Sequence, residues 1–379
     1  MQISLKSEAL SAMLVHFTII PDPRIERGKL HKLVDVLAIS FLASLGGAVG
    51  YEDMEDYAID NEEWLKTFLE LPHGIPSHDT IRSVLCRLDP ELFLKVVLEA
   101  IGSLFGHEVK RHIAIDGKTL CHSFDKSQGQ EALHMVSAWA VGERLFLGQV
   151  KVDDKSNEIT AVPKLIEMLD VKGAVITGDA MICQKEIVEQ IISKGGDYVF
   201  SLKGNHPSLH QLVGGRFERC HQNQFQDVKH AYSETTDKDH GRIEIRKYWQ
   251  VDVSAWRKTK EEWKGLRTIG MVEAERIIGE KSSKEVRYFI SSLEPNAKEF
   301  SKAVRGHWEI ENTLHWSLDV QLREDESRIR RDRGPENMAI LRRLAVSYLK
   351  RDVNDKRSLR RKARSAWVSP ANMLKLLQL

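Results

Sequence analysis

The chain has 379 residues and a formal net charge of +1, with 42% hydrophobic and 29% charged residues, so we expect a soluble globular protein of two or three domains. Its N-terminus lacks the features of a signal peptide, and its longest uncharged stretch, residues 36–51, is too short to span a bilayer. Together with four scattered cysteines that match no zinc-ligand spacing, these features indicate a cytoplasmic protein without a membrane partner.

Residues 1–105 are predicted to form a small helical domain. Residues 31–45 carry apolar side chains at helical spacing, and Ser77 can cap a helix that begins near His78. No recognition-helix pattern stands out in this region. It is therefore interpreted either as a DNA-binding module or as a scaffold.

A different pattern begins near residue 106, where strands and helices alternate. Residues 133–141 and 144–152 are two predicted strands joined by a short turn, which indicates a hairpin. The order of elements predicts an α/β domain with a mixed sheet over residues 106–345, interrupted by a β-rich insertion at about residues 215–295. The other predicted strands of the core are residues 111–120, 174–181 and 197–203, and its helices are residues 158–170 and 185–195.

The last part of the chain is predicted to be helical and basic. Helices resume near Asn296, and residues 346–379 form a predicted C-terminal helical segment. Between Arg328 and Arg364 there are fourteen lysines or arginines and four acidic residues. This local excess of positive charge favours a nucleic-acid partner over the alternative, a solvated helical surface.

Three carboxylates that are far apart in the sequence are the candidate catalytic residues. Asp116 lies near the end of one predicted strand and Asp179 at the end of another, where ligands gather in α/β sheets, and Glu311 lies on a late helix. If the two strands are neighbours, the aspartates come together. Carboxylates suit hard cations such as Mg²⁺, and a pair of such ions can act on a phosphodiester. Taken singly, Asp116 can also be a turn residue and Asp179 a helix cap.

Polar side chains near these carboxylates are candidate DNA ligands. Lys118 can neutralise a phosphate, and the glycine between it and Asp116 lets the backbone approach a ligand closely. Lys203 and Asn205 can hold a nucleic-acid backbone, or they simply form a polar loop. Arg242 lies on a predicted strand that either touches DNA or is only exposed.

A histidine-based metal site is a rival interpretation of the late helix. His307 and His315 lie four residues to either side of Glu311, which puts all three side chains on one helix face. Such a face can bind a transition metal such as Zn²⁺, independently of the two aspartates. The alternative to a metal site is that these side chains simply form a polar, partly buried face of the helix.

Together these segments resemble the DDE transposases of bacterial insertion sequences, in the branch that contains the H-repeat-associated proteins. The resemblance covers nearly the whole chain, and many motifs in the same order make it more specific than three acidic residues alone. The matching segments are AIDGKTLCHSFDKS, VKVDDKSNEITAVPKLIEMLD, ITGDAM, GGDYVFSLKGN, HGRIEIR and HWEIENTLHWSLDV, preceded by PDPR, VGYEDMEDYA and GIPSHDTIRSVL.

This resemblance implies an RNase-H-like catalytic core interrupted by the β-rich insertion. The family's two aspartates and its glutamate match Asp116, Asp179 and Glu311, which would bind two Mg²⁺ or Mn²⁺ ions. The implied reaction is metal-dependent cleavage at the ends of the element, followed by strand transfer into target DNA. The implied partners are the terminal repeats, the target DNA and further copies of the chain, assembled on that DNA at the nucleoid.

The sequence departs from a signature of Tyr, Arg, Glu and Lys that related transposases carry around the glutamate. The positions of the Tyr, Arg and Lys are Val304, His307 and Leu318 here, and only Glu311 is retained. The DNA-positioning roles of that signature therefore need other residues in this chain.

Arg305 and His307 are the predicted substitutes for these DNA contacts, with Arg323 as a further one. Two rival functions stay open at this point. One is a nuclease on the same core that does not transfer strands, and the other is an inactive DNA-binding relic.

Overall fold

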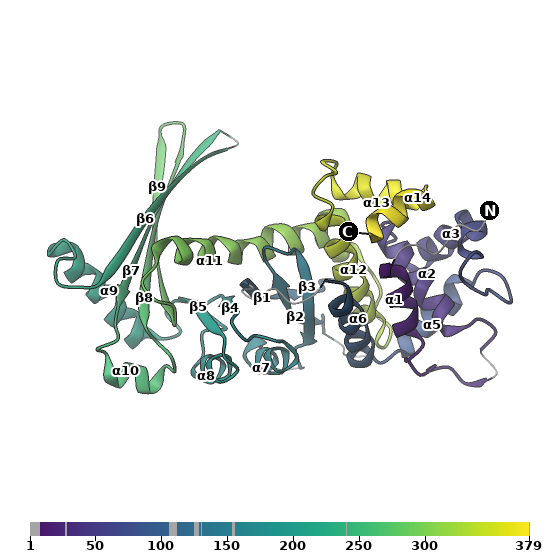
Figure 1. Cartoon of the computed structure of the whole chain (residues 1–379), viewed down its shortest axis with the longest axis horizontal. Helices are drawn as coiled ribbons and strands as arrows, with labels where there is room; N and C mark the ends of the chain where they lie inside the picture. Colours follow the sequence, from purple (N-terminus) through teal and green to yellow (C-terminus); the bar gives the residue numbers. More distant parts are fainter. Residues whose placement is uncertain are drawn as a thin grey trace.

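The computed structural model describes residues 8–26, 29–105, 112–124, 129, 131–153, 156–239 and 241–378, and structural statements refer to these residues. The molecule is elongated, with helices at the N-terminal end, a sheet in the middle and an arm of long strands at the far end (Figure 1). The strands are β1 (His112–Thr119), β2 (His134–Ala140), β3 (Leu145–Lys151), β4 (Val175–Gly178), β5 (Asp197–Leu202), β6 (His230–Asp239), β7 (Arg242–Asp252), β8 (Thr268–Ile278) and β9 (Lys281–Ser291).

Helices precede, interrupt and follow this sheet. Those before it are α1 (Glu8–Phe17), α2 (Leu33–Leu45), α3 (Tyr51–Asp60), α4 (Glu62–Leu65), α5 (His78–Arg87) and α6 (Pro90–Phe105). Those between the strands are α7 (Glu158–Met168), α8 (Lys185–Ser193), α9 (Pro207–Gln222) and α10 (Arg257–Glu262). After the strands come α11 (Ala297–Glu309), the π-helical segments η2 (Ile310–His315) and η3 (Ser317–Gln321), the 3-10 turn η4 (Glu324–Glu326), α12 (Gly334–Arg351), α13 (Leu359–Trp367) and α14 (Pro370–Leu377).

The N-terminal helices gather around α2, which is apolar on nearly every side. All but one of its 13 residues are buried, as expected of a helix that other helices surround. The predicted helix start at His78 is confirmed, because the Ser77 side chain accepts the backbone N–H of Thr80 at the beginning of α5. No helix among the described residues is long and apolar enough to cross a bilayer.

The strands of the predicted core are all present, and β2 and β3 form the predicted antiparallel hairpin. β1 pairs antiparallel with β2 and parallel with β4, and β4 pairs parallel with β5. Asp116 lies inside β1 and not at its end, because the ladder with β2 continues to Thr119. In Figure 1, α7 and α8 lie on one face of the sheet and α11 crosses the other.

The predicted β-rich insertion extends this sheet and does not form a separate one. β9 pairs antiparallel with β5, with Val199 opposite Ser291. One sheet therefore runs through the described strands in the order β3-β2-β1-β4-β5-β9-β8-β7-β6. Strands β6 to β9 are each 10 or 11 residues long and form the arm, which continues past the end of β5 (Figure 1).

The N-terminal and C-terminal helices share one hydrophobic core. α2 packs against α12, where the ring centroids of Phe41 and Tyr348 are 5.8 Å apart. α12 also runs across residue 345, where the sequence places the end of the catalytic domain. The division into three domains stays a prediction. Among the described residues, one hydrophobic core includes side chains from all three predicted domains.

Candidate active site

Asp116 lies in β1, and Asp179 directly follows β4, the strand next to β1 in the sheet. The parallel pairing of β1 with β4 ends with Ala114 opposite Thr177, and Asp116 and Asp179 each stand two residues beyond this last pair. One oxygen of Asp179, Oδ1, accepts the N–H groups of Met181 and Ile182 at 2.9 and 3.2 Å. Asp179 therefore does cap the turn before α8, and this leaves its other oxygen for a ligand.

The helix that carries Glu311 crosses the sheet above these aspartates. Gly306 lets α11 come close to β1, because a Cβ at this position would lie 2.4 Å from the ring of His112. The helix then widens into η2, and such π-helical turns are frequent at functional sites. Glu311 itself is exposed to solvent.

The two histidines of the late helix face different aspartates. His315 Nδ1 is 3.5 Å from Asp116 Oδ2, whereas the charge of Asp179 acts on the half-buried His307. Among the described residues, no three His, Cys, Asp or Glu side chains are grouped closely enough to hold one metal ion. This applies to the rival set of His307, Glu311 and His315, and equally to the set of Asp116, Asp179 and Glu311.

The electrostatics of the site leave its negative charge uncompensated. Burial, together with the charges of Glu158, Asp179 and Glu311, raises the pKa of Asp116 to about 7, although a backbone hydrogen bond from Gly117 acts in the opposite direction. Burial also lowers the pKa of His307 to about 4 and that of His315 to about 3. Both imidazoles are therefore neutral at pH 7, and they cannot balance the carboxylates.

Divalent cations fit this set of residues. Mg²⁺ prefers carboxylate oxygens, and it is usually held by one or two carboxylates while water and phosphate oxygens complete its shell. Asp116, Asp179 and Glu311 can each supply such oxygens, because an ion of this kind does not need all three carboxylates as ligands. In addition, Nδ1 of His307 and Nε2 of His315 are buried and have no hydrogen-bond partner among the described residues. These nitrogens are free to bond the water of a hydrated ion.

The raised pKa of Asp116 predicts that the metal-free protein loses stability as the pH rises. The folded state keeps a proton on Asp116 up to about pH 7, whereas the unfolded chain releases it near the model value of 3.8. The free energy of unfolding should therefore fall between about pH 4 and pH 7, relative to that of an Asp116→Asn variant. Denaturant midpoints of both proteins from pH 5 to pH 8, without divalent ions, check this. Parallel pH profiles would contradict it.

Lys118 is held inside the protein. Its ammonium group lies 2.6 Å from Asp319 Oδ1 and 3.1 Å from Asp325 Oδ1, and its side chain is only 9% exposed. Its charge is thus already paired with carboxylates that follow Glu311 in the chain. This arrangement ties β1 to the segment after the late helix, and a phosphate contact by Lys118 stays an untested prediction.

The loop after β5 supports the loop that carries Asp179. The Asn205 side chain donates a hydrogen bond to the carbonyl of Ala180 at 2.6 Å, and His206 Nε2 lies 2.6 Å from the carbonyl of Cys183. Lys203 is exposed at the start of this loop. Asn205 therefore has a positioning contact beside Asp179, whereas DNA binding by Lys203 and Asn205 stays a prediction.

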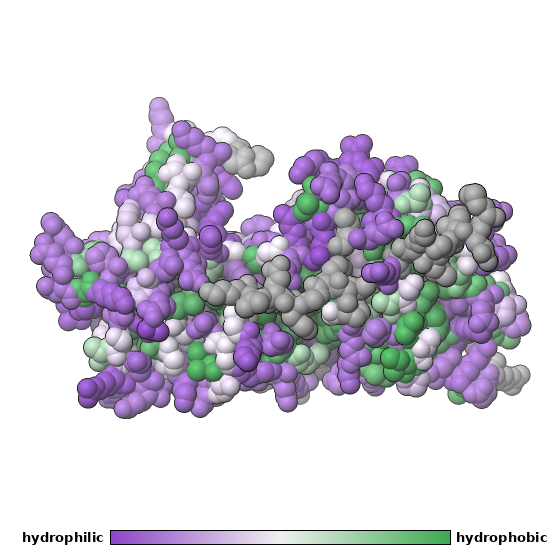
Figure 2. Space-filling view, viewed as in Figure 1, coloured by the Kyte–Doolittle hydropathy of each residue, from purple (hydrophilic) through white to green (hydrophobic). Residues whose placement is uncertain are grey.

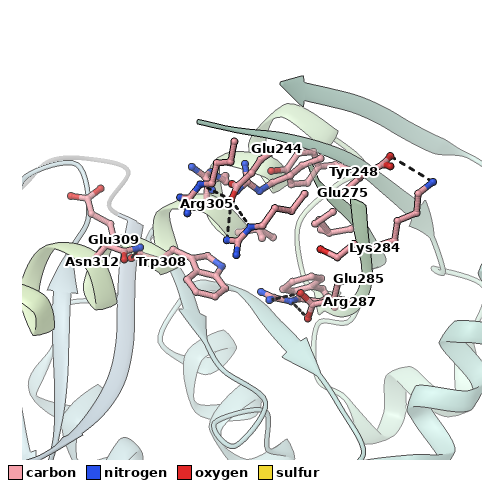
Figure 3. A pocket seen from close by; sticks show the side chains of 18 of the residues that line it. Glu244, Tyr248, Glu275, Lys284, Glu285, Arg287, Arg305, Trp308, Glu309 and Asn312 are labelled. Atoms are coloured by element: carbon pink, nitrogen blue, oxygen red, sulfur yellow. Dashed lines mark hydrogen bonds and ion pairs between the residues drawn. The ribbon is translucent and has the colours of Figure 1, made fainter. Parts of the chain in front are cut away.

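Arg242 and Arg305 line a cavity of about 850 Å³ between strands β7 to β9 and the late helix. Figure 3 shows side chains of the strands and of α11 converging on it. The guanidinium carbon of Arg287 lies 5.0 Å from the centroid of the Trp308 ring. The lining includes four acidic residues, Glu244, Glu275, Glu285 and Glu309, and six basic ones, Arg242, Arg246, Arg276, Lys284, Arg287 and Arg305.

Two features of this site were not predicted from the sequence. Glu158, at the start of α7, acts on Asp116 more strongly than Asp179 or Glu311 does. Arg343 is fully buried and donates a hydrogen bond to Ser137, which lies opposite Asp116 in the sheet. In the sequence, Glu158 stands only at the start of a predicted helix, and Arg343 stands only within a basic segment. Neither pattern could assign these residues to the site.

The comparisons with known proteins agree with this architecture. A family described as DDE_Tnp_1-associated matches residues 14–100, and one described as Transposase DDE domain matches residues 107–348. The chain belongs to the DDE transposase family.

Curated relatives extend this similarity over nearly the whole chain. The H repeat-associated putative transposase YhhI of Escherichia coli (strain K12) is 41% identical over 362 residues, covering 94% of this chain and 95% of that protein. Putative transposase YncI of Escherichia coli O157:H7 is 40% identical over 354 residues, covering 92% of this chain and 89% of that protein. The resemblance to the H-repeat-associated branch is therefore confirmed.

Membership in this family implies DNA as a partner and, typically, divalent metal ions in the reaction. The mixed sheet, in which β1 to β3 are antiparallel and β4 and β5 run parallel to β1, is consistent with an RNase-H-like DDE domain.

Proposed function

We propose that the chain is a DNA transposase that cuts DNA at the ends of its element and joins these ends to target DNA. In this proposal Asp116, Asp179 and Glu311 hold two Mg²⁺ or Mn²⁺ ions in an RNase-H-like core. The observation that supports it most is the parallel pairing of β1 with β4, which brings the two aspartates level beneath the helix that carries Glu311. The enzyme would work in the cytoplasm, as a homo-oligomer on the terminal repeats and the target.

The residues of the site divide the work of this reaction between them. Bound divalent ions would supply an activated water and charge stabilisation at the phosphodiester. Asp116 must lose its proton to act as a ligand, and its raised pKa makes this depend on the neighbouring cation. His315, neutral and next to Asp116, can orient that carboxylate without competing for its charge. Water attacks the phosphodiester at the end of the element, and the freed 3′-hydroxyl then attacks a phosphodiester of the target DNA. Neither step needs a covalent protein intermediate.

The arginine-lined cavity is the proposed path of the DNA backbone toward these carboxylates. Asn312 and Thr313, which directly follow Glu311, are part of its wall. Hydrophilic side chains also cover most of the visible face of the strand arm in Figure 2. In the view of Figure 1, this arm and the basic helix α13 rise on the same side of α11. A duplex lying between them would meet the basic residues of the cavity lining on one side and the basic helix α13 on the other, which would add salt-dependent affinity.

An Arg305→Ala substitution is expected to weaken DNA binding and to lower the dependence of log Kd on log salt concentration by about one unit, as the loss of one phosphate contact does. Arg305 is 48% exposed and its only ion pair among the described residues is a 3.8 Å contact with Asp237, so the substitution should not disturb the fold. Fluorescence anisotropy at several salt concentrations measures this slope. Lys302→Ala, which removes an exposed charge from the same helix outside the cavity, should leave it unchanged. Equal slopes for both variants would remove Arg305 from the DNA path.

The decisive experiment incubates the purified protein with Mg²⁺ or Mn²⁺, a duplex that carries the ends of its element and a supercoiled target plasmid. Metal-dependent cleavage followed by joined products is the expected result. Cleavage without joining would instead favour the nuclease. Stable binding without cleavage would favour the inactive DNA-binding relic.

A further inference from the structure

The turn that begins with Asp179 is held by side chains. Residues 179–184, between the end of β4 and the start of α8, form neither helix nor strand. Three of the backbone carbonyls in this turn accept hydrogen bonds from side chains. The donors are Asn205 to Ala180, Gln184 to Met181 and His206 to Cys183. The conformation of the turn therefore depends on these donors, because irregular backbone must find its hydrogen-bond partners outside a helix or ladder.

His206 reaches the turn from the start of α9, and its role as a donor is fixed. Nε2 of His206 lies 2.6 Å from the carbonyl oxygen of Cys183. A carbonyl oxygen can only accept a hydrogen bond, so Nε2 carries a proton in this contact. The ring packs edge-on against Trp263, with 5.0 Å between the centroids. Trp263 is only 3% exposed and lies in the insertion, directly before the strand β8 region. The insertion thus orients the imidazole that donates to the turn.

The carbonyl that His206 bonds is part of the same short backbone segment as the Asp179 contacts. Asp179 Oδ1 accepts the N–H groups of Met181 and Ile182, so its carboxylate follows the backbone of these residues. Ile182 and Cys183 are fully buried. Without its donor, the Cys183 carbonyl would be an unsatisfied polar group in the interior unless the turn rearranged. Such a rearrangement would move the peptide groups that hold Asp179.

We propose that His206 is a positioning residue of the active site, whose hydrogen bond to Cys183 keeps the Asp179 carboxylate in the orientation that a metal ion requires. This inference rests on the proposed function, because Asp179 is one of its metal ligands. Loss of a group that orients a metal ligand typically costs about 10- to 100-fold in metal affinity or activity. The competing explanation is that His206 only joins the start of α9 to the core and contributes stability alone.

Two substitutions at residue 206 separate the hydrogen bond from the ring. His206→Phe keeps an aromatic ring against Trp263 but cannot donate, whereas His206→Gln places an amide N–H close to the position of Nε2. Binding of Mn²⁺ to the full-length protein is followed by the electron paramagnetic resonance signal of free Mn²⁺. The Kd should rise at least about tenfold in His206→Phe and stay within about twofold of the wild type in His206→Gln.

The matched control is His221→Phe. His221 is an exposed histidine near the other end of α9, and it also packs edge-on against a tryptophan, Trp249, with 5.3 Å between the centroids. It lies outside the Asp179 turn and its donors. This variant should bind Mn²⁺ like the wild type.

A second measurement examines the turn without metal or DNA. The amides of Met181 and Ile182 are bonded to Asp179, and they should exchange with deuterated water faster in His206→Phe, because a turn that has lost a hydrogen bond opens more often. His206→Gln should restore the slow exchange. Thermal melting of each variant identifies a general loss of stability, which would accelerate exchange throughout the chain and not only in this turn.

The outcomes separate this inference from the proposed function. If His206→Phe binds Mn²⁺ as tightly as the wild type, while Asp179→Asn binds it weakly, His206 does not position the carboxylate and the metal site stands without it. Equal losses in His206→Phe and His206→Gln would also overturn the inference, because the ring and not the donor would then matter. If His206→Phe loosens the turn but Asp179→Asn binds Mn²⁺ like the wild type, His206 holds the turn and the proposed metal site at Asp179 is wrong.

Discussion

Replacing Asp179 by asparagine is expected to lower the rate of DNA cleavage by roughly a thousandfold, because a metal ligand contributes several kcal/mol of transition-state stabilisation. Asparagine keeps an oxygen that can accept the N–H groups of Met181 and Ile182, so the turn after β4 should persist. Only the negative charge is lost. Single-turnover cleavage of element-end DNA in Mg²⁺ measures the effect, with DNA affinity determined in parallel.

Asp170→Asn is the matched control for this experiment. Asp170 is an exposed aspartate that also accepts a backbone N–H in a turn, that of Lys172 at 3.3 Å, but it lies before β4 instead of after it. The control should cleave at the wild-type rate. Comparable cleavage by Asp179→Asn would remove Asp179 from the metal site, and with it the reason for placing the reaction between β1 and β4.

Removal of the Glu324 carboxylate should be the most destabilising of the substitutions considered. Glu324 Oε1 lies 3.1 Å from Arg343 Nη1 and 4.0 Å from Arg342 Nη1, and the exposed fraction of each of these three side chains is at most 3%. Glu324→Ala would leave two buried guanidinium groups without their shared counterion. Breaking a buried pair in this way costs about 3–5 kcal/mol of unfolding free energy.

The effect should extend beyond η4, because the two arginines connect distant parts of the chain. Arg342 donates a hydrogen bond to the carbonyl of Val49, and Arg343 donates one to the Ser137 hydroxyl on β2. Urea denaturation followed by circular dichroism measures the loss. Glu326→Ala, which removes an exposed ion pair with Arg323 in the same turn, should change the midpoint little. Similar midpoints for both variants would show that Glu324 does not stabilise the cluster.

The sequence predicted the elements around the site well because their patterns are local. Alternating apolar residues mark the β2–β3 hairpin, and Ser77 marks the start of α5. The pairing of β1 with β4, on which the meeting of Asp116 and Asp179 depends, was only one possibility from the sequence, and the structure shows it. The assignment of Asp116, Asp179 and Glu311 as catalytic residues stays a prediction.

Features that depend on partners far away in the chain could not be predicted in this way. The pairing of β9 with β5 joins the insertion to the core, but no local pattern specifies which edge a strand will use. The phosphate contact predicted for Lys118 stays untested, but no local pattern indicated that its ammonium group would pair with Asp319 and Asp325, which lie about 200 residues later. Glu158 follows an ordinary N-cap residue, so the sequence marks it only as the start of a helix. In the structure its carboxylate occupies the space beside Gly117 that a side chain at residue 117 would need.

The shared core of the first and last helices has a consequence for how the protein is made. α2 buries its apolar surface partly against α12, so this surface stays open on the ribosome until residues 334–351 have emerged. Contacts this distant in sequence form late, and exposed apolar helices invite aggregation in the meantime. A stop codon before α12 would therefore yield a product whose N-terminal helices cannot complete their packing, even though the three proposed catalytic carboxylates had already been translated.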